Sequence, residues 1–570
     1  MNASELLVKA LQAEGVEVVF GLPGEENLHF IEALRDHPTI KLVLVRHEQA
    51  GGFMAAAYWR LTGKIAVAYS TLGAGATNLT TPAAHAYLGG FPTLFITGQK
   101  PIRENRQGLY QLLDISSVMA PVVKITRTVE SGADVAITVH EAFKEMRSGR
   151  PGPAHIELPE DVAKDETDGQ LFPAVHAPAP VASDEAIEQA LTALFKAKSP
   201  LFMLGAAAEG HGIPEAFREL AQRVKIPYFC TWMGKGVGDE SDENFIGSIT
   251  MPGMDYVGAA AKNADVILNI GHDIAEKAPF LMRPESGQIV IHVNAFPAHA
   301  DHIYFPQHQV VGDITHTLRR MTEMCQGSHV PRHSFGALLS KLGMATGGSP
   351  DWDHGFARSM GTKMRASIAR GADDAKSFPA KPQFLAAAAR AALPADGIIT
   401  LDNGVHKLWF TRNFPVSTPQ CHLVDSALGS MGLALPAAIA AAIAYPDRAV
   451  LAVAGDGGFM MNAQELETAK RLELNIVVLI LNDNGLGMIR MKQVMEGNSP
   501  FSVDFSNPDF VTLAEAHGAT GYRLDNPAQL PEILESAFAN GGLHVIDAPV
   551  DYRENVGLLK EMKMASASKG

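Results

Sequence analysis

A glycine-rich motif in the C-terminal third contains the residue types needed to hold a diphosphate through a divalent cation. Residues 455–458 read Gly-Asp-Gly-Gly, and a second acid, Asp483, lies in the Asn-Asp-Asn-Gly sequence of residues 482–485. Mg²⁺ accepts few protein oxygen ligands and completes its octahedron with phosphate oxygens. Glycines at 457 and 458 would let a phosphate approach the backbone. Taken alone, the motif is equally compatible with a strand-end turn carrying two solvated acids.

The surrounding pattern predicts elements that bring the two acids together. An apolar run at 449–454 precedes Asp456, an amphipathic run follows at 463–472, and a second apolar run at 475–481 leads to Asp483. This order predicts a strand, a glycine turn, a helix and a second strand. In an open α/β sheet the C-terminal tips of such strands line one ligand crevice. The two acids are therefore expected side by side.

Composition narrows the class of protein. The chain has 570 residues, which predicts three to four domains. A hydrophobic content of 46% with 19% charged residues is typical of globular proteins. The net charge of −15, without any basic run, argues against nucleic acid or an anionic membrane as partner. Three scattered cysteines and an N-terminus that directly enters a helical pattern predict a cytoplasmic protein without disulfides.

Alternating helical and apolar patterns predict an α/β fold with three parallel-sheet domains. We expect these domains at residues 1–172, 183–330 and 378–556. A Pro- and Ala-rich linker separates the first two, and the Gly/Ser/Pro cluster at 347–350 lies in the second connection. Glycine turns in the middle domain are weak evidence for a nucleotide, and a purely structural domain is the simpler interpretation.

A second acid of interest, Glu48, begins a helical stretch near the N-terminus. Residues 46–50 read Arg-His-Glu-Gln-Ala, and the second histidine of a zinc-protease signature is missing. Alone, Glu48 is explained as an acid favoured by the dipole at a helix N-terminus. Three further motifs accompany it, at residues 20–24 (Phe-Gly-Leu-Pro-Gly), 70–78 (Ser-Thr-Leu-Gly-Ala-Gly-Ala-Thr-Asn) and 110–111 (Tyr-Gln).

This succession of motifs, from about residue 4 to residue 556, resembles the acetohydroxyacid/acetolactate synthase family, whose enzymes depend on thiamine diphosphate (ThDP). The resemblance implies a pyrimidine-binding, a central and a diphosphate/Mg²⁺-binding domain, in that order. Two positions depart from the family pattern. Ala74 replaces the usual proline, and Asp483 replaces the more common asparagine while remaining an oxygen donor.

The resemblance also implies residue roles. Glu48 is the catalytic glutamate, hydrogen-bonded to N1′ of the aminopyrimidine, and Gln111 contacts the intermediate or the acceptor. The implied metal ligands are Asp456, Asp483 and the carbonyl of Gly485. The implied cofactor contacts are Glu48, Asn78, Gly404, His406, Gly429, Met431, Gly457, Gly458 and Met488. The implied substrate pocket comprises Leu22, Gln111 and Ile489.

Two of these residues have simpler explanations from the sequence alone. Met431 is expected to sit beneath the cofactor and enforce its V shape, but a methionine in such a run is usually core filler. His406 is expected near the diphosphate, but an exposed loop histidine is the more common case.

Three details resemble the catabolic, FAD-independent branch more than the biosynthetic one. Residues 271–277 lack the arginine-rich run of the flavin-dependent enzymes, Lys492 stands where those enzymes place a tryptophan, and residues 546–555 resemble the catabolic C-terminus. FAD is therefore expected to be absent. Against this, Glu25 and Glu26 place two acids where they would repel an anionic substrate, unless they simply begin the next helix.

The implied reaction is ThDP- and Mg²⁺-dependent decarboxylation of pyruvate, followed by condensation of the enamine with a second pyruvate to give 2-acetolactate and CO₂. A homodimer or homotetramer with active sites between subunits is implied as well. The alternatives are another ThDP-dependent 2-keto acid decarboxylase, carboligase or C–C lyase, or a non-catalytic ThDP-binding homologue.

Overall fold

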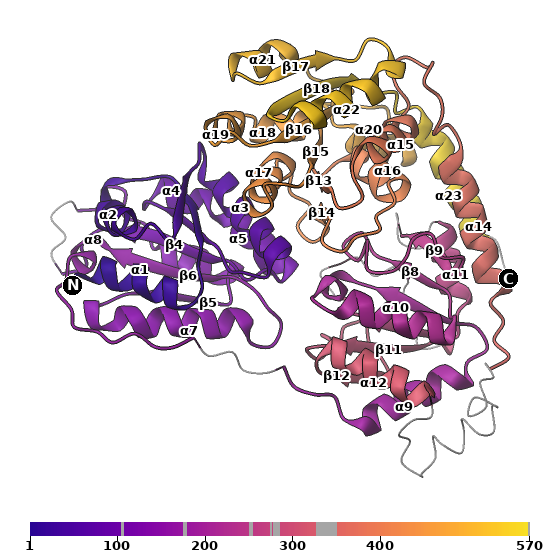
Figure 1. Cartoon of the computed structure of the whole chain (residues 1–570), viewed down its shortest axis with the longest axis horizontal. Helices are drawn as coiled ribbons and strands as arrows, with labels where there is room; N and C mark the ends of the chain where they lie inside the picture. The colour runs from indigo at the N-terminus through magenta and orange to yellow at the C-terminus, as the bar shows by residue number, and fades with distance from the viewer. Residues whose placement is uncertain are drawn as a thin grey trace.

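The computed structural model describes residues 1–103, 108–174, 179–249, 255–273, 276, 286–326 and 350–567, without the side chains of 565–567. Within these ranges the chain forms three six-stranded parallel sheets, each flanked by helices (Figure 1). The predicted α/β fold with three parallel-sheet domains is confirmed. Residues 347–349 of the predicted Gly/Ser/Pro cluster and residues 327–330 of the predicted central domain lie outside the described residues.

The N-terminal sheet has the strand order β2-β1-β3-β4-β6-β5. Its strands are β1 (Val18–Gly21), β2 (Lys41–Leu44), β3 (Val67–Ser70), β4 (Leu94–Gln99), β5 (Ile125–Thr128) and β6 (Ala154–Pro159). Its helices are α1 (Ala3–Ala13), α2 (Leu28–Asp36), α3 (Glu48–Thr62), α4 (Ala74–Asn78), α5 (Thr80–Gly89), α6 (Ile115–Met119), α7 (Val135–Arg147) and α8 (Glu160–Ala163).

The central sheet has the order β12-β11-β10-β7-β8-β9, so its first strand lies beside its fourth. Its strands are β7 (Pro200–Leu204), β8 (Tyr228–Cys230), β9 (Phe245–Ser248), β10 (Val266–Ile270), β11 (Ile289–Asn294) and β12 (His308–Val311). Its helices are α9 (Asp184–Lys196), α10 (Ile213–Val224), α11 (Tyr256–Asn263) and α12 (Ile314–Gln326), and α14 (Gly355–Ala369) leads to the next domain.

The C-terminal sheet, β14-β13-β15-β16-β18-β17, repeats the strand order of the N-terminal one. Its strands are β13 (Ile398–Leu401), β14 (His422–Val424), β15 (Val450–Gly455), β16 (Ile476–Asn482), β17 (Thr520–Arg523) and β18 (Leu543–Pro549). Its helices are α15 (Pro382–Ala392), α16 (Val405–Asn413), α17 (Ala434–Ala444), α18 (Asp456–Met461), α19 (Glu465–Arg471), α20 (Gly487–Met495), α21 (Phe510–Ala516), α22 (Leu530–Asn540) and α23 (Glu554–Ala567).

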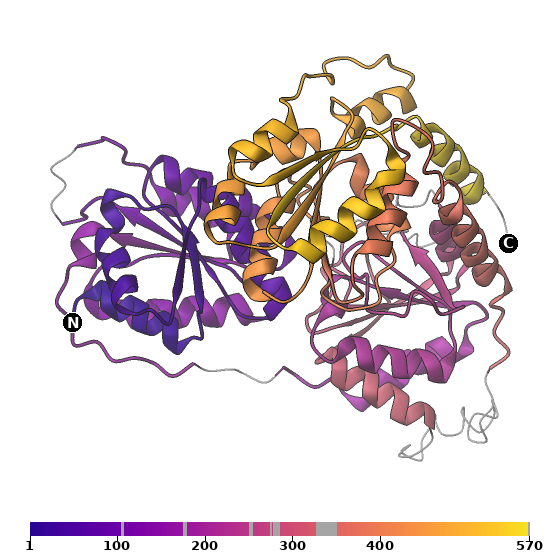
Figure 2. The ribbon, with the colours of Figure 1, turned by 45° about the horizontal axis from the view of Figure 1, so that its top comes forward.

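The N- and C-terminal domains share one apolar core because α3 packs against α17 (Figures 1 and 2). Helix α17 is alanine-rich and buried along almost its whole length, so no polar face needs to reach water. The predicted glycine turn after residue 455 is instead the first turn of α18, which begins at Asp456. Among the described helices, none is both long and apolar enough to cross a bilayer.

Candidate functional site

Three neighbouring strands of the C-terminal sheet end at one pocket. Strand β15 lies between β13 and β16, and Gly455 at its tip pairs in register with Leu481. Asp456 and Asp483 therefore follow adjacent strand tips, as the sequence pattern predicted. The pocket collects most of the expected C-terminal site residues: Gly404, His406, Met431, Asp456, Gly457, Gly458, Asp483, Gly485, Met488 and Ile489.

The two expected metal-binding carboxylates are both shielded from water. Burial raises the pKa of Asp456, and burial together with the charge of Asp456 raises the pKa of Asp483 to about 6. Each carboxylate has a partner: Asn507 Nδ2 donates to Asp456 at 2.8 Å, and Arg490 Nη1 donates to Asp483 at 2.6 Å. The two carboxylates, whose negative charges repel each other, lie beside the backbone carbonyl of Gly485. Together these oxygens form a donor set that suits Mg²⁺.

The floor of the pocket depends on glycine. A Cβ atom at Gly458 would lie 2.9 Å from Asp402 Oδ1, and one at Gly457 would lie 3.1 Å from the Phe505 ring. A side chain at either position would therefore press against Asp402 or Phe505. At the N-terminus of α18 the backbone N–H of Gly457 donates to Asp456 Oδ1 at 2.9 Å.

His406 is buried rather than exposed, so the exposed-loop alternative is wrong. Its Nε2 lies 3.0 Å from the carbonyl oxygen of Asp402, which requires the proton on Nε2. Burial, reinforced by the charge of Lys407, lowers the pKa of His406 to about 3. The ring is therefore neutral, and its Nδ1 lone pair faces the backbone of Gly404 and Gly455.

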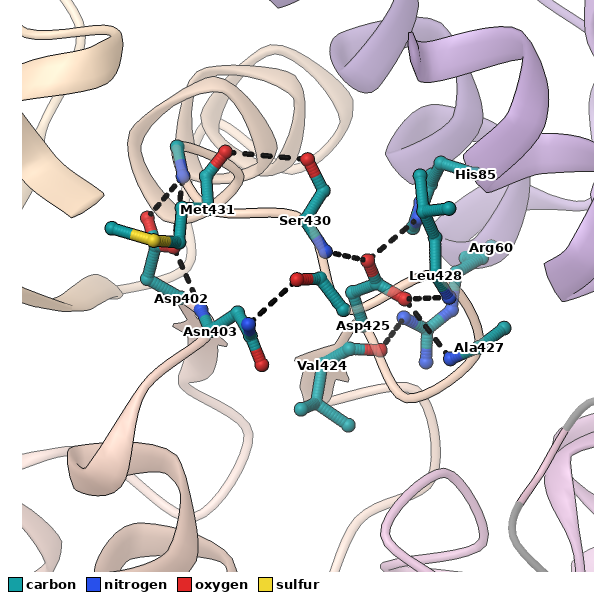
Figure 3. A network of polar contacts seen from close by, with 12 residues as sticks. Arg60, His85, Asp402, Asn403, Val424, Asp425, Ala427, Leu428, Ser430 and Met431 are labelled. Atoms are coloured by element: carbon teal, nitrogen blue, oxygen red, sulfur yellow. Dashed lines mark hydrogen bonds and ion pairs between the residues drawn. The ribbon is translucent and has the colours of Figure 1, made fainter. Parts of the chain in front are cut away.

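A buried polar network holds the loop that carries Gly429 and Met431 (Figure 3). Asp402 accepts the backbone N–H groups of Asn403 at 2.7 Å and Gly432 at 2.9 Å, while burial raises the pKa of Asp402 to about 6. The Asn403 side-chain amide donates to the Gly429 carbonyl at 2.6 Å. That carbonyl can thus accept from an NH₂ group, which is the role expected of it towards an aminopyrimidine.

The N-terminal domain braces the same loop from outside. His85 Nδ1 lies 3.3 Å from Asp425 Oδ2, and Arg60 donates to the carbonyl of Val424 at 2.9 Å (Figure 3). Burial would raise the pKa of Asp425, but His85 and the N–H of Ser430 outweigh it and hold that pKa well below its usual range. The loop conformation therefore depends on contacts between the two domains.

The expected N-terminal site residues gather at the other sheet. Glu48 is the first residue of α3, is buried, and accepts a hydrogen bond from Asn78 Nδ2 at 3.0 Å. Leu22 is half-buried against the apolar core. Gln111 is exposed in a left-handed turn (φ 57°), and its backbone carbonyl lies close to Gly73.

The two halves do not meet within one chain. Among the described residues, the pocket around Asp456 is lined only by the C-terminal domain. In the same chain, the N-terminus of α3 instead contacts α19, where Glu465 accepts the backbone N–H of His47 at 3.0 Å. Large apolar side chains are exposed near each half: Leu109, Tyr110 and Leu113 on one, and Met460, Met461, Ile489 and Phe501 on the other.

The structure explains how Glu25 and Glu26, the two acids expected to repel an anionic substrate, are accommodated. Glu25 and Glu26 begin a short 3₁₀ helix, and Glu25 points to solvent. Glu26 is buried and forms an ion pair of 2.9 Å with the buried Lys100, and Thr71 Oγ1 donates to it at 2.6 Å. Burial opposes ionisation, but these two partners lower the pKa of Glu26. The charge of Glu26 is therefore balanced inside the protein.

The central domain has a second cavity at its topological switch point, between β7 and β10. It is lined by Glu209, Asp273 and Asp313 of the central domain and also by Arg60 of the N-terminal domain, which pairs with Glu209 at 3.4 Å. At this point the buried Glu276 carboxylate accepts the backbone N–H of Ala206 at 2.9 Å and the hydroxyl of Thr231. Residues 274, 275 and 277 of the segment compared with flavin enzymes lie outside the described residues.

Sequence reasoning missed several residues that contact the site. Asp402 follows strand β13, so the strand-tip rule that identified Asp456 would have identified it. Arg490, Asp504 and Asn507 gave no such indication, because they reach Asp456 and the turn at Asp483 from a helix and a later loop. Tyr552, which lines the pocket, comes from the segment after β18.

Comparisons with known proteins agree with this arrangement. The N-terminal, central and C-terminal domain models of thiamine pyrophosphate (TPP, equivalent to ThDP) enzymes match residues 1–118, 187–321 and 402–548. An acetolactate synthase of Bacillus subtilis (strain 168) is 31% identical over 98% of this chain and 95% of its own length. A catabolic acetolactate synthase of Raoultella terrigena is 30% identical over 99% and 98%. A probable acetolactate synthase large subunit of Methanococcus aeolicus is 30% identical over 97% and 92%.

Proposed function

The chain belongs to the thiamine pyrophosphate enzyme family, alongside acetolactate synthases, and we propose that it is itself a Mg²⁺-dependent acetolactate synthase. It would decarboxylate one pyruvate and join the two-carbon fragment to a second pyruvate, giving 2-acetolactate and CO₂. The observation that carries this proposal is the single pocket in which Asp456, Asp483 and Met431 surround glycine backbone.

The residues present fit the cofactor and its metal. Asp456, Asp483 and the Gly485 carbonyl would hold Mg²⁺, and the backbone at Gly457 and Gly458 would face the diphosphate. The cofactor, when bound, supplies a carbon nucleophile and accepts the electron pair released with CO₂. Glu48 would hold and exchange a proton at the pyrimidine ring, an acid–base role that contributes about 10²–10⁴-fold to such reactions.

A second copy of the chain would complete the site. Glu48, Leu22 and Gln111 lie on one domain, and none of the three lines the described pocket around Asp456 on the other. Exposed apolar side chains beside both halves support burial against a partner. We therefore propose a homodimer or homotetramer with active sites at the subunit interface.

Pyruvate is the proposed donor and acceptor. Ile489 and Leu22 would present apolar surface that excludes water from the reacting carbon, and Gln111 would donate a hydrogen bond to the acceptor. Lys492, exposed on α20, leaves space where a tryptophan favours a larger acceptor in the biosynthetic branch. Internal pairing of Glu26 with Lys100 removes the repulsion that would oppose an anionic substrate.

We further propose that FAD is not a cofactor. In dinucleotide-binding sheets the backbone N–H groups at the switch point face a diphosphate. Here the Glu276 carboxylate accepts the Ala206 N–H, and the adjoining cavity carries Glu209, Asp273 and Asp313. The Ala206 donor is therefore occupied by a carboxylate of the protein itself, which a diphosphate would have to displace. A cytoplasmic location is proposed too, since Cys230, Cys325 and Cys421 are buried free thiols.

The decisive experiment is incubation of the purified protein with ¹³C-labelled pyruvate, ThDP and Mg²⁺, with product identification by NMR. Labelled 2-acetolactate with one CO₂ per two pyruvates is expected. Acetaldehyde as the sole product would identify a decarboxylase instead, and absence of turnover with bound ThDP would identify a non-catalytic homologue. A flavin absorption spectrum in the purified protein would overturn the proposal on FAD.

A further inference from the structure

Asp483 lies in the wall between two pockets. One is the pocket that also contains Asp456, Gly457 and Gly458. The other lies between α20 and α23 and is lined by Asp483 and Arg490 among others. Arg490 lines the second of these pockets and not the first, so it reaches the carboxylate from outside the pocket that contains Gly457 and Gly458.

Arg490 bridges two carboxylates from different segments. Its Nη1 donates to Asp483 Oδ2 at 2.6 Å, and its Nη2 donates to Asp504 Oδ1 at 2.5 Å. The guanidinium also lies against Gly485, where any side chain would overlap it. Asp483 is nearly buried, with a side chain 9% exposed, whereas Asp504 is 74% exposed. Arg490 therefore connects a buried acid to a surface one.

The backbone reinforces this bridge. The segment with Asp504 pairs antiparallel with the metal-binding turn, through a bridge between Gly485 and Asp504. The N–H of Leu486 donates to Val503 at 2.8 Å on one side of this bridge. The turn that supplies two of the three proposed metal ligands is thus held in place by the loop that carries Asp504.

We propose that Arg490, anchored by Asp504, is a positioning residue that holds Oδ2 of Asp483 from outside, leaving the other carboxylate oxygen turned towards the metal. The proposal rests on the proposed function and deepens its metal site. At position 483 a carboxylate adds a second negative charge beside Asp456, whereas an amide would add none. Arg490 balances this negative charge. Partners of this outer kind typically change metal affinity about 10–100-fold when removed.

The test is the affinity of the apoenzyme for Mn²⁺ in the presence of ThDP, followed by electron paramagnetic resonance, with ThDP binding measured by calorimetry. Arg490→Met is expected to weaken Mn²⁺ binding about 10-fold or more. Arg490→Lys keeps the positive charge, but a single ammonium group cannot contact both carboxylates as the planar guanidinium does. This variant should therefore retain only part of the Mn²⁺ affinity. Arg127→Met removes an exposed arginine paired with Glu141 at 2.8 Å, which lines neither pocket, and is the matched control, expected to bind as the wild type does.

Repeating the Mn²⁺ measurement in the Asp483→Asn variant distinguishes loss of the contact with the Asp483 carboxylate from a general loss of structure in Arg490→Met. An asparagine at position 483 offers an oxygen ligand without a negative charge for Arg490 to balance. Adding Arg490→Met to Asp483→Asn should therefore weaken Mn²⁺ binding by less than about 2-fold. Equal losses in both backgrounds, or Mn²⁺ binding by Arg490→Met as tight as wild type, would overturn the proposal. A wild-type protein that binds neither Mn²⁺ nor ThDP would instead refute the proposed function, so the two failures are distinguishable.

Discussion

The carboxylate of Glu465 accepts the backbone N–H of His47 at 3.0 Å, joining the C-terminal domain to the residue immediately before Glu48. The same carboxylate accepts the N–H of Arg46 at 3.0 Å and the hydroxyl of Thr468 at 2.6 Å. His47 is the N-cap of α3, so this contact sets where the helix begins and where Glu48 projects. The proposed catalytic glutamate thus depends on a residue more than 400 positions away.

The first prediction concerns the pH dependence of stability. Burial raises the pKa of Glu465 from 4.5 to about 7. The folded protein therefore retains this proton longer than the unfolded chain, and the resulting stabilisation is lost as pH rises through 7. Between pH 5 and pH 8, the unfolding free energy of the wild type should fall about 2 kcal/mol more than that of Glu465→Gln. Urea denaturation at both pH values measures this.

The neighbouring Glu467→Gln is the control for that experiment. Glu467 lies on the same helix but pairs with Arg471 at 3.0 Å instead of with α3. Its variant should follow the wild-type pH dependence. A Glu465→Gln protein with the same pH dependence as the wild type would show that Glu465 does not carry the raised pKa.

The second prediction separates cofactor binding from catalysis at Glu48. Glu48→Gln should retain ThDP and Mg²⁺ affinity, because the metal pocket lies on another domain, and should lose about 10²–10⁴-fold in kcat. Calorimetric ThDP titration and initial rates of pyruvate consumption provide the two measurements. Glu25→Gln, an exposed acid of the same domain, should leave both values unchanged. Full activity in Glu48→Gln would remove this residue from the mechanism.

The third prediction distinguishes the two glycines under the pocket. In Gly458→Ala the new methyl group lies 2.9 Å from the buried Asp402 carboxylate, so the apoprotein should lose about 1–3 kcal/mol of stability. In Gly457→Ala it meets the edge of the Phe505 ring at 3.1 Å, a side chain that can move, so the apoprotein stability should change little. Both variants should bind ThDP more weakly, as measured by calorimetry. Undiminished binding in both would contradict the assigned diphosphate site.

The fourth prediction tests the buried pair of Glu26 and Lys100. Each single variant, Glu26→Gln or Lys100→Met, leaves an uncompensated buried charge. Each should therefore lower the free energy of unfolding by about 3–5 kcal/mol. The double variant leaves no charge there and should be less destabilised than the sum of the two. Thermal and urea unfolding of all four proteins complete the cycle. Additive losses would show that the two groups do not interact.

Much of the scaffold follows from local pattern. The apolar run at 449–454 and the one at 475–481 form β15 and β16 within a residue or two, because a strand buried on both faces needs continuous apolar sequence. The run at 433–444 forms the buried helix α17. Strand β3 begins at Val67, and its register against Val19 of β1 is a tertiary property.

Partners from distant segments could not be predicted this way. Asp504 and Asn507 come close to the turn at Asp483, and to Arg490, only because a later loop folds back over it. Glu465 gave no indication that it would bind the backbone before Glu48. From the sequence alone His406 could also be an exposed loop residue. In the structure, burial keeps its ring neutral, and the contact with the Asp402 carbonyl fixes its tautomer.

The kinds of chemical group available, and their placement at strand tips, follow from the sequence alone. Hydrophobic periodicity defines the strands, and parallel order then brings Asp456 beside Asp483. Three features depend instead on the tertiary structure: which oxygen of Asp483 Arg490 holds, which donor occupies the Gly429 carbonyl, and that Glu48 does not line the described pocket around Asp456 in the same chain. Hydrogen bonds and burial between residues far apart in sequence leave no local pattern, because they depend on how whole domains pack.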